Sequence, residues 1–172
     1  MTVGTITFGM LFAVAALLVL AAASDIRSFE IPNWIPATIV GLYIAYVIIR
    51  NVIYPEFGAV AWLPAVGAAA LVLFVFTVLF ARGLIGGGDV KLLTAVSLWV
   101  GFSMLINLLF WTSVGGGLLA LFLLIRHKYL SPPLESGKKN IRKAEIPYGI
   151  AIAFGGILTG FQMVRLGELS LP

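Results

Sequence analysis

The chain has 172 residues, of which 61% are hydrophobic and 10% are charged, and its formal net charge at pH 7 is +4. A soluble globular domain of this length needs far more polar surface, so the composition excludes one and predicts an integral membrane protein. Apolar runs of about 18 or more residues recur along the chain, each long enough to cross a hydrocarbon core of about 30 Å as a helix. Such continuity favours helices over a β-barrel.

We therefore expect a single all-α domain over residues 1–172, built as a bundle of about six transmembrane helices. The predicted spans are 6–23, 35–52, 61–81, 90–100, 105–125 and 147–166. The first run ends in Ala21-Ala22-Ala23-Ser24, which resembles a signal-peptide cleavage site, but no basic residue precedes it and it is long, so we interpret it as a span. The fourth is short enough to be re-entrant instead.

The distribution of cations predicts the orientation. If the fourth span crosses, nine cations share one side and two, Arg50 and Arg165, lie on the other; if it does not, the split is four against seven. The positive-inside rule favours six crossings, with the nine-cation side cytoplasmic and both termini outside. We expect the protein in the cell's inner (cytoplasmic) membrane. The nine are Arg27, Arg82, Lys91, Arg126, Lys128, Lys138, Lys139, Arg142 and Lys143.

Two aspartates stand where apolar runs meet polar loops. Asp25 follows the first run, and Asp89 follows three glycines before the fourth. Because only the second and third spans separate them, both carboxyls are expected on one side of the membrane, facing the cytoplasm. Ionisable groups at membrane depth are functional candidates by default. Either aspartate alone also fits a structural role, Asp89 as a helix N-cap and Asp25 as the end of the first span.

Two close carboxyls supply the chemistry of peptide hydrolysis. One takes the proton of the attacking water while the other donates to the carbonyl oxygen or the leaving nitrogen. Like charges at short range resist ionising together, so one proton is shared by the pair. Coupled groups titrate as a pair, and the sequence therefore assigns neither aspartate as the acid. The glycines before Asp89 let the backbone approach a substrate strand closely.

Other residues carry weaker signals. The chain has no cysteine, which excludes disulfides, thiolate metal sites and a cysteine nucleophile, and its one histidine, His127, fits a loop. We predict no metal, no organic cofactor and no nucleic-acid partner. We interpret Gly115-Gly116-Gly117 as positions of close helix packing.

Three local motifs together resemble the type IV prepilin peptidase family of membrane aspartyl proteases. They are residues 25–33 (DIRSFEIPN), residues 86–92 (GGGDVKL), which contain a G-x-G-D signature, and residues 147–149 (PYG). The resemblance implies that Asp25 and Asp89 are the catalytic pair and that Gly86 and Gly88 shape the loop around the scissile strand. It also implies that a set of neighbouring residues supports the pair. These are Arg27, Lys91, Pro147, Tyr148 and Gly149.

The implied substrate is a prepilin or pseudopilin, whose short basic leader is cut off at the cytoplasmic membrane boundary. The larger family members add a cysteine-bearing cytoplasmic insert and N-methylate the product, and this chain lacks both cysteine and insert. It is thus similar to the short members that only cleave and serve Flp/Tad-type or archaeal pili. As a hypothesis, Glu30, Glu135 or Glu145 attracts the basic leader.

Two other functions stay open at this point: a small transporter with Asp25 and Asp89 as a proton relay, and a non-catalytic helical subunit of a pilus assembly complex. Relay acids usually lie near mid-membrane, whereas these stand at span ends. A presenilin-type protease shares the G-x-G-D signature, but its Pro-Ala-Leu motif is absent. The oligomeric state is not predicted.

Overall fold

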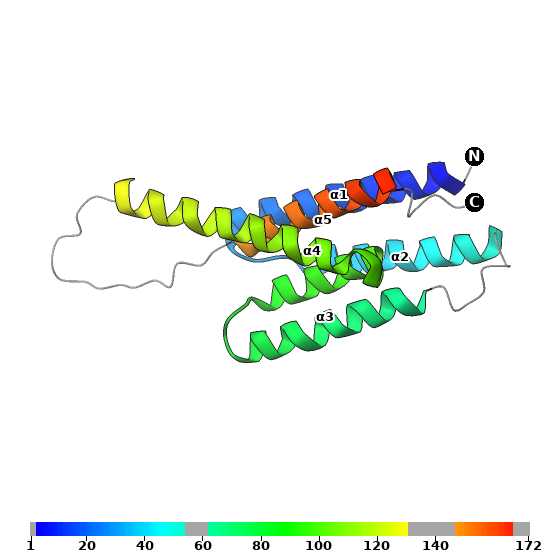
Figure 1. The fold of residues 1–172 in the computed structure, drawn as a ribbon, viewed down its shortest axis with the longest axis horizontal. Helices are drawn as coiled ribbons and strands as arrows, with labels where there is room; N and C mark the ends of the chain where they lie inside the picture. The colour runs from blue at the N-terminus through cyan, green and yellow to red at the C-terminus, as the bar shows by residue number, and fades with distance from the viewer. Residues whose placement is uncertain (1–2, 54–61, 131–146, 167–172) are drawn as a thin grey trace.

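The computed structural model describes residues 3–53, 62–130 and 147–166, and it contains five α-helices and no strand within those ranges (Figure 1). Each is long and apolar enough to cross a membrane. The prediction of an all-α, multi-pass membrane protein is therefore confirmed. The helices are α1 (Val3–Ser28), α2 (Trp34–Ile53), α3 (Leu63–Ala81), α4 (Gly87–Leu130) and α5 (Tyr148–Leu166).

The predicted fourth and fifth spans are the two halves of α4. The helix is broken at Gly101, whose φ of 57° and ψ of −168° are not helical, and Figure 1 shows the ribbon reversing direction there. Leu93 and Gly116 consequently line one cavity, whereas a straight helix would separate them by about 35 Å. The first half, from Gly87 to the break, measures about 20 Å and is shorter than an average hydrocarbon core. Five helices thus replace the six predicted, with the same order of segments.

The first helix extends beyond its predicted end at residue 23. The Ser28 hydroxyl donates to the Ser24 carbonyl at 2.9 Å, and helical hydrogen bonding continues to Ser28. Phe29 then takes a left-handed φ of 53°, and its N–H donates to the Asp25 carbonyl at 2.9 Å. This conformation is a common helix end. Asp25 therefore lies inside the last turns of α1, not in the loop that follows.

Glycines bring α5 into close contact with both α1 and α4. A Cβ at Gly155 would clash with Thr112 of α4, whose backbone nitrogen would be 2.7 Å away, and a Cβ at Gly156 would lie 2.8 Å from Leu18 of α1. Small residues allow membrane helices to approach this closely. Since α5 is held between α1 and α4, its first residue, Tyr148, is placed at the same end of the bundle as Asp25 (Figure 1).

Gly101 offers a test of the break. Its φ and ψ fall in a region that is essentially restricted to glycine, where another residue costs about 1–3 kcal/mol. We expect Gly101→Ala to lower the free energy of unfolding by that amount, measured by denaturant titration in mixed micelles. The matched control is Gly41→Ala, where an added Cβ meets nothing within 4 Å; it should leave stability unchanged or slightly raised. Equal losses in both variants would contradict the strained break.

Candidate active site

The structure brings the two aspartates to one end of the bundle. Asp25 lies in the last turns of α1 and is only 5% exposed, while Asp89 lies in the first turn of α4. The charge of Asp25 acts directly on Asp89, so the two carboxyls are within electrostatic range of each other. Residues that are 64 positions apart in the chain therefore form one acidic pair.

Asp25 is held by the start of α5. The Gly149 N–H donates to the Asp25 Oδ2 at 2.6 Å, and the unpaired N–H groups at a helix N-terminus favour a negative group there. A Cβ at Gly149 would lie 2.9 Å from Oδ2 and 3.1 Å from the Asp25 Cβ. The site therefore requires a glycine here, and one oxygen of Asp25 has a fixed position.

Asp89 is held by its own helix start. The backbone N–H of Gly86 interacts with the Asp89 carboxyl, and the Val90 N–H donates to the Gly86 carbonyl at 3.2 Å. A Cβ at Gly86 would lie 2.8 Å from the Asp89 Oδ2, so the carboxyl folds back over this glycine. The arrangement resembles a capping box, in which a side chain at the third helical position satisfies an N-terminal donor. A capping role and membership of the acidic pair are thus compatible.

The turn between α1 and α2 docks on the start of α4. Ile31 packs on Gly88, where an added Cβ would lie 3.2 Å from the Ile31 Cβ. The Lys91 Nζ donates to the Asn33 Oδ1 at 2.8 Å. The Ser24 hydroxyl donates to the Glu30 carbonyl at 2.9 Å and shapes the turn from the other side. The two sequence motifs that carry the aspartates are therefore in direct contact.

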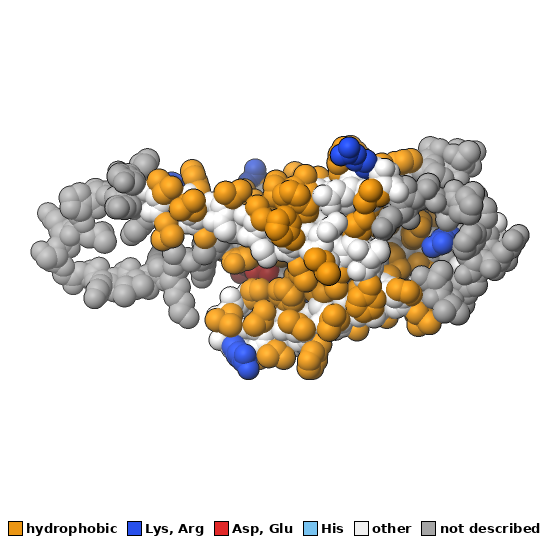
Figure 2. All heavy atoms as spheres, in the orientation of Figure 1, with side chains coloured by type: hydrophobic (Ala, Val, Ile, Leu, Met, Phe, Trp, Pro, Cys, Tyr) orange, Lys and Arg blue, Asp and Glu red, His pale blue; other side chains and the backbone are white. Residues whose placement is uncertain are grey.

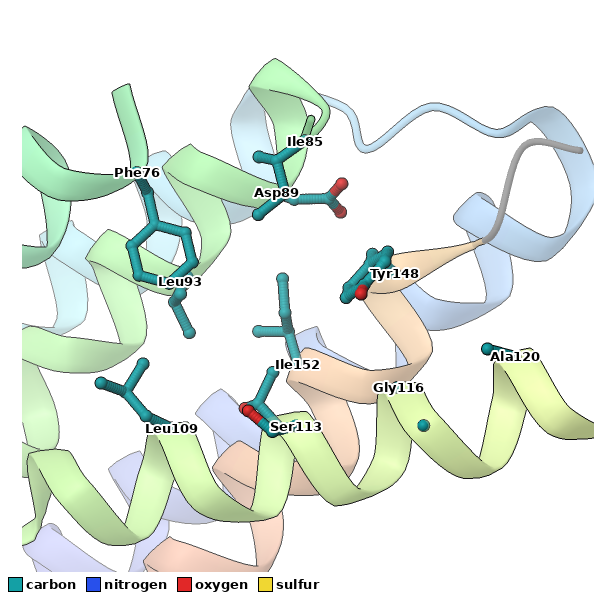
Figure 3. Close-up of a pocket in the computed structure, with 12 residues that line it drawn as sticks. Phe76, Ile85, Asp89, Leu93, Leu109, Ser113, Gly116, Ala120, Tyr148 and Ile152 are labelled. Carbon is teal, nitrogen blue, oxygen red and sulfur yellow. The ribbon is translucent and has the colours of Figure 1, made fainter. Parts of the chain in front are cut away.

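A cavity of about 350 Å³ opens beside Asp89 (Figure 3). Apart from Asp89, the labelled side chains around it are mostly apolar, and they come from α3, the turn before α4, both halves of α4 and the start of α5. Figure 2 shows an acidic group in a notch between apolar surfaces on this face of the bundle. The lining residues are Phe76, Ile85, Asp89, Leu93, Leu109, Thr112, Ser113, Gly116, Gly117, Ala120, Tyr148 and Ile152.

The remaining predicted site residues divide into two groups. Tyr148 lines the cavity, and Pro147 is buried directly before α5. Arg27 is exposed in the last turn of α1, and its role at the site stays a prediction. No cluster of three or more His, Cys, Asp or Glu residues that would suit a metal ion occurs in the described part of the chain.

Sequence reasoning missed the second half of α4 as a wall of the site. The packing role predicted for the three glycines is found at two of them: an added Cβ at Gly115 would lie 3.4 Å from the Ala151 Cα, and one at Gly116 would lie 3.3 Å from Tyr148. Gly117 instead lines the cavity and has nothing within 4 Å of an added Cβ. The sequence held one indication of this difference: close packing on a single neighbouring helix does not need three consecutive glycines.

The fold and the paired carboxyls define a helical membrane protein with an acidic site at one end of its bundle. The chain belongs to the type IV leader peptidase family, whose model matches residues 12–121. The matched range contains both aspartate motifs and ends before residues 147–149, so the family resemblance is confirmed and a peptidase function follows in general terms. No curated protein and no solved structure matches the chain.

The contact between Gly149 and Asp25 yields a prediction on activity. Gly149→Ala would force the Asp25 carboxyl to move, and a displacement of about 1 Å at a reacting group can cost about 100-fold in rate. We expect a loss of that order in peptidase activity on a leader-bearing substrate. Gly160→Ala, on the same helix but with nothing within 4 Å of the added Cβ, should stay close to wild type. Equal activities of the two variants would contradict the positional role of Gly149.

The hydrogen bond between Lys91 and Asn33 yields a second prediction. Removing either partner, by Lys91→Met or Asn33→Leu, should loosen the contact between the two motifs, and removing both should cost less than the sum. Because the bond is exposed, we expect a coupling energy of about 0.5–1 kcal/mol in a double-mutant cycle of unfolding free energies. Strictly additive losses would show that the bond does not join the motifs.

Proposed function

We propose that this protein is a membrane aspartyl endopeptidase that removes the leader from prepilin-like substrates, with Asp25 and Asp89 as the catalytic pair. One observation carries the proposal: two carboxyls from distant helices converge at one end of the bundle, and one of them borders a cavity. Family membership supports the peptidase class. If each aspartate only stabilised the end of its own helix, the two carboxyls would not need to converge, and no cavity would be needed beside Asp89.

The chemistry follows from the pair. The Gly149 N–H fixes one oxygen of Asp25, and Asp89 faces the cavity in which a substrate backbone would lie. One carboxylate removes a proton from water as the water attacks the peptide carbonyl, and the protonated partner donates its proton to the carbonyl oxygen. When the C–N bond breaks, the first carboxyl passes the proton it took from water to the leaving nitrogen, and the partner regains its proton from a hydroxyl of the tetrahedral intermediate. Two carboxyls in mutual electrostatic range share one proton readily because their double ionisation is unfavourable.

The orientation of the site follows from the positive-inside rule. Arg27, Arg82 and Lys91 belong to helix ends or turns at the site end of the bundle, and the second half of α4 returns there with Arg126. Arg50 and Arg165 end α2 and α5 at the opposite end. This distribution supports a cytoplasmic site with both termini outside. A leader cut at the cytoplasmic boundary lies at the depth of Asp25 and Asp89.

The proposal extends to the product and to the leader. Without the cysteine-bearing insert, the enzyme cleaves and does not methylate, so mass spectrometry of the product should find a free N-terminal amine. Glu30 is exposed in the turn after α1, five positions after Asp25 in the chain, and this position suits attraction of a basic leader. Glu135 and Glu145, proposed for the same role from the sequence, lie outside the described residues.

The decisive experiment is cleavage of a purified prepilin by the purified protein in liposomes. Asp25→Asn and Asp89→Asn keep the side-chain shape but cannot exchange protons, and each should lower kcat by about 10²–10⁴-fold. Thr38→Val serves as the control, since the Thr38 hydroxyl only donates to the Trp34 carbonyl within α2. Cleavage that persists in both aspartate variants would refute the catalytic pair. Proton flux without any cleaved product would instead identify a transporter.

A further inference from the structure

An apolar groove runs from Asp89 along the membrane-facing side of the bundle. One side is formed by α3, through Phe76, and the other by the second half of α4, with Leu93 and Ile152 at its base (Figure 3). At the far end α3 and α4 meet, since an added Cβ at Gly67 would lie 2.9 Å from the Phe102 ring. This contact lies outside the cavity lining, and Asp89 is the member of the acidic pair that lines the cavity.

The α4 side of this groove consists of small side chains on one helical face. Ser113, Gly117 and Ala120 recur at the three- and four-residue spacing that places residues on one face of a helix, and all three line the cavity. Ser113 and Gly117 are exposed. An added Cβ at Gly117 would meet nothing within 4 Å, so packing within the described bundle leaves open space at this position. The side chains on this face are small, although packing on α5 does not need a glycine at position 117.

We propose that this groove docks the substrate segment that follows the leader, as an apolar helix with one face inserted between α3 and the second half of α4. This inference rests on the proposed function and deepens it, since it places the part of the substrate that is not cut. Three features select a helix. Apart from Asp89 and the hydroxyl-bearing Thr112, Ser113 and Tyr148, the lining is apolar. Small residues let helix backbones approach closely in a membrane, and the α4 wall from Leu109 to Ala120 is about 16 Å long.

The groove includes Asp89 of the acidic pair, and this continuity favours the substrate over a lipid chain or a second copy of the protein as its occupant. A helix that lies along α4 with its end beside Tyr148 and Asp89 presents the peptide bond at its end to Asp25 and Asp89. By holding the helix, the groove determines which peptide bond lies beside the carboxyls. The carboxyls then act on the substrate segment just outside the groove. Gly117 becomes a determinant of which substrate side chains fit.

The test uses matched size changes on enzyme and substrate. The probe is a peptide with a short basic leader and an apolar helix of about 20 residues, reconstituted with the enzyme in liposomes. Gly117→Leu should lower kcat/KM about tenfold or more, because a pocket filled by several methylenes rejects a large side chain. A set of peptides, each with one large helix residue replaced by Ala, should contain one that restores cleavage by Gly117→Leu to near the wild-type rate.

The control is Leu118→Phe, at the adjacent residue, which is 60% exposed and does not line the cavity; its rate should stay within about twofold of wild type. A photoreactive residue at position 113 should crosslink to the peptide's helix. The docking proposal is wrong if Gly117→Leu cleaves normally, if no substrate truncation rescues it, or if the crosslinks go to lipid or a second copy. If the wild-type protein cleaves none of the peptides, the proposed function itself fails.

Discussion

The site depends on one hydrogen bond between remote parts of the chain, from the Gly149 N–H to the Asp25 Oδ2. It satisfies a buried acid with a donor from a helix N-terminus, where the backbone offers N–H groups that no helical carbonyl uses. Because α5 also packs on α4 through Gly155 and Thr112, fixing its start fixes the distance from Asp25 to the second half of α4. Tyr148 and Ile152 of α5 and the second half of α4 both line the cavity beside Asp89.

The break at Gly101 is the second constraint. A continuous helix of 44 residues would carry the second half of α4 about 40 Å away from Asp89. Reversal at a glycine-only conformation brings that half back along the first, and Ser113 and Gly117 then stand opposite α3 across the groove. The same break leaves a short first half, so that Asp89 begins a helix that spans only part of the bilayer thickness.

Both carboxyls of the pair are held by backbone N–H groups at helix starts, Asp25 by Gly149 and Asp89 by Gly86. Acids are costly at membrane depth, and donors of this kind offset part of that cost without adding a basic side chain that would neutralise the pair. At both positions an added Cβ would lie within 3 Å of a carboxylate oxygen, so the carboxyl would have to shift. The glycines therefore let the backbone and the carboxyls come into contact.

The sequence by itself determined the membrane class, the positions of the apolar helices and the common side of Asp25 and Asp89. Hydropathy is a local property of each segment, and the side on which a residue lies follows from counting the spans that precede it. The motif resemblance also indicated the family before any contact was known. Only the tertiary structure decided that α1 continues through Asp25, that α4 reverses at Gly101, and that Gly149 bonds to Asp25 across 124 positions. Hydropathy carries no information on which face of one helix meets another, so the partners of Asp25, Lys91 and Gly88 and the groove beside Gly117 depend on helix packing.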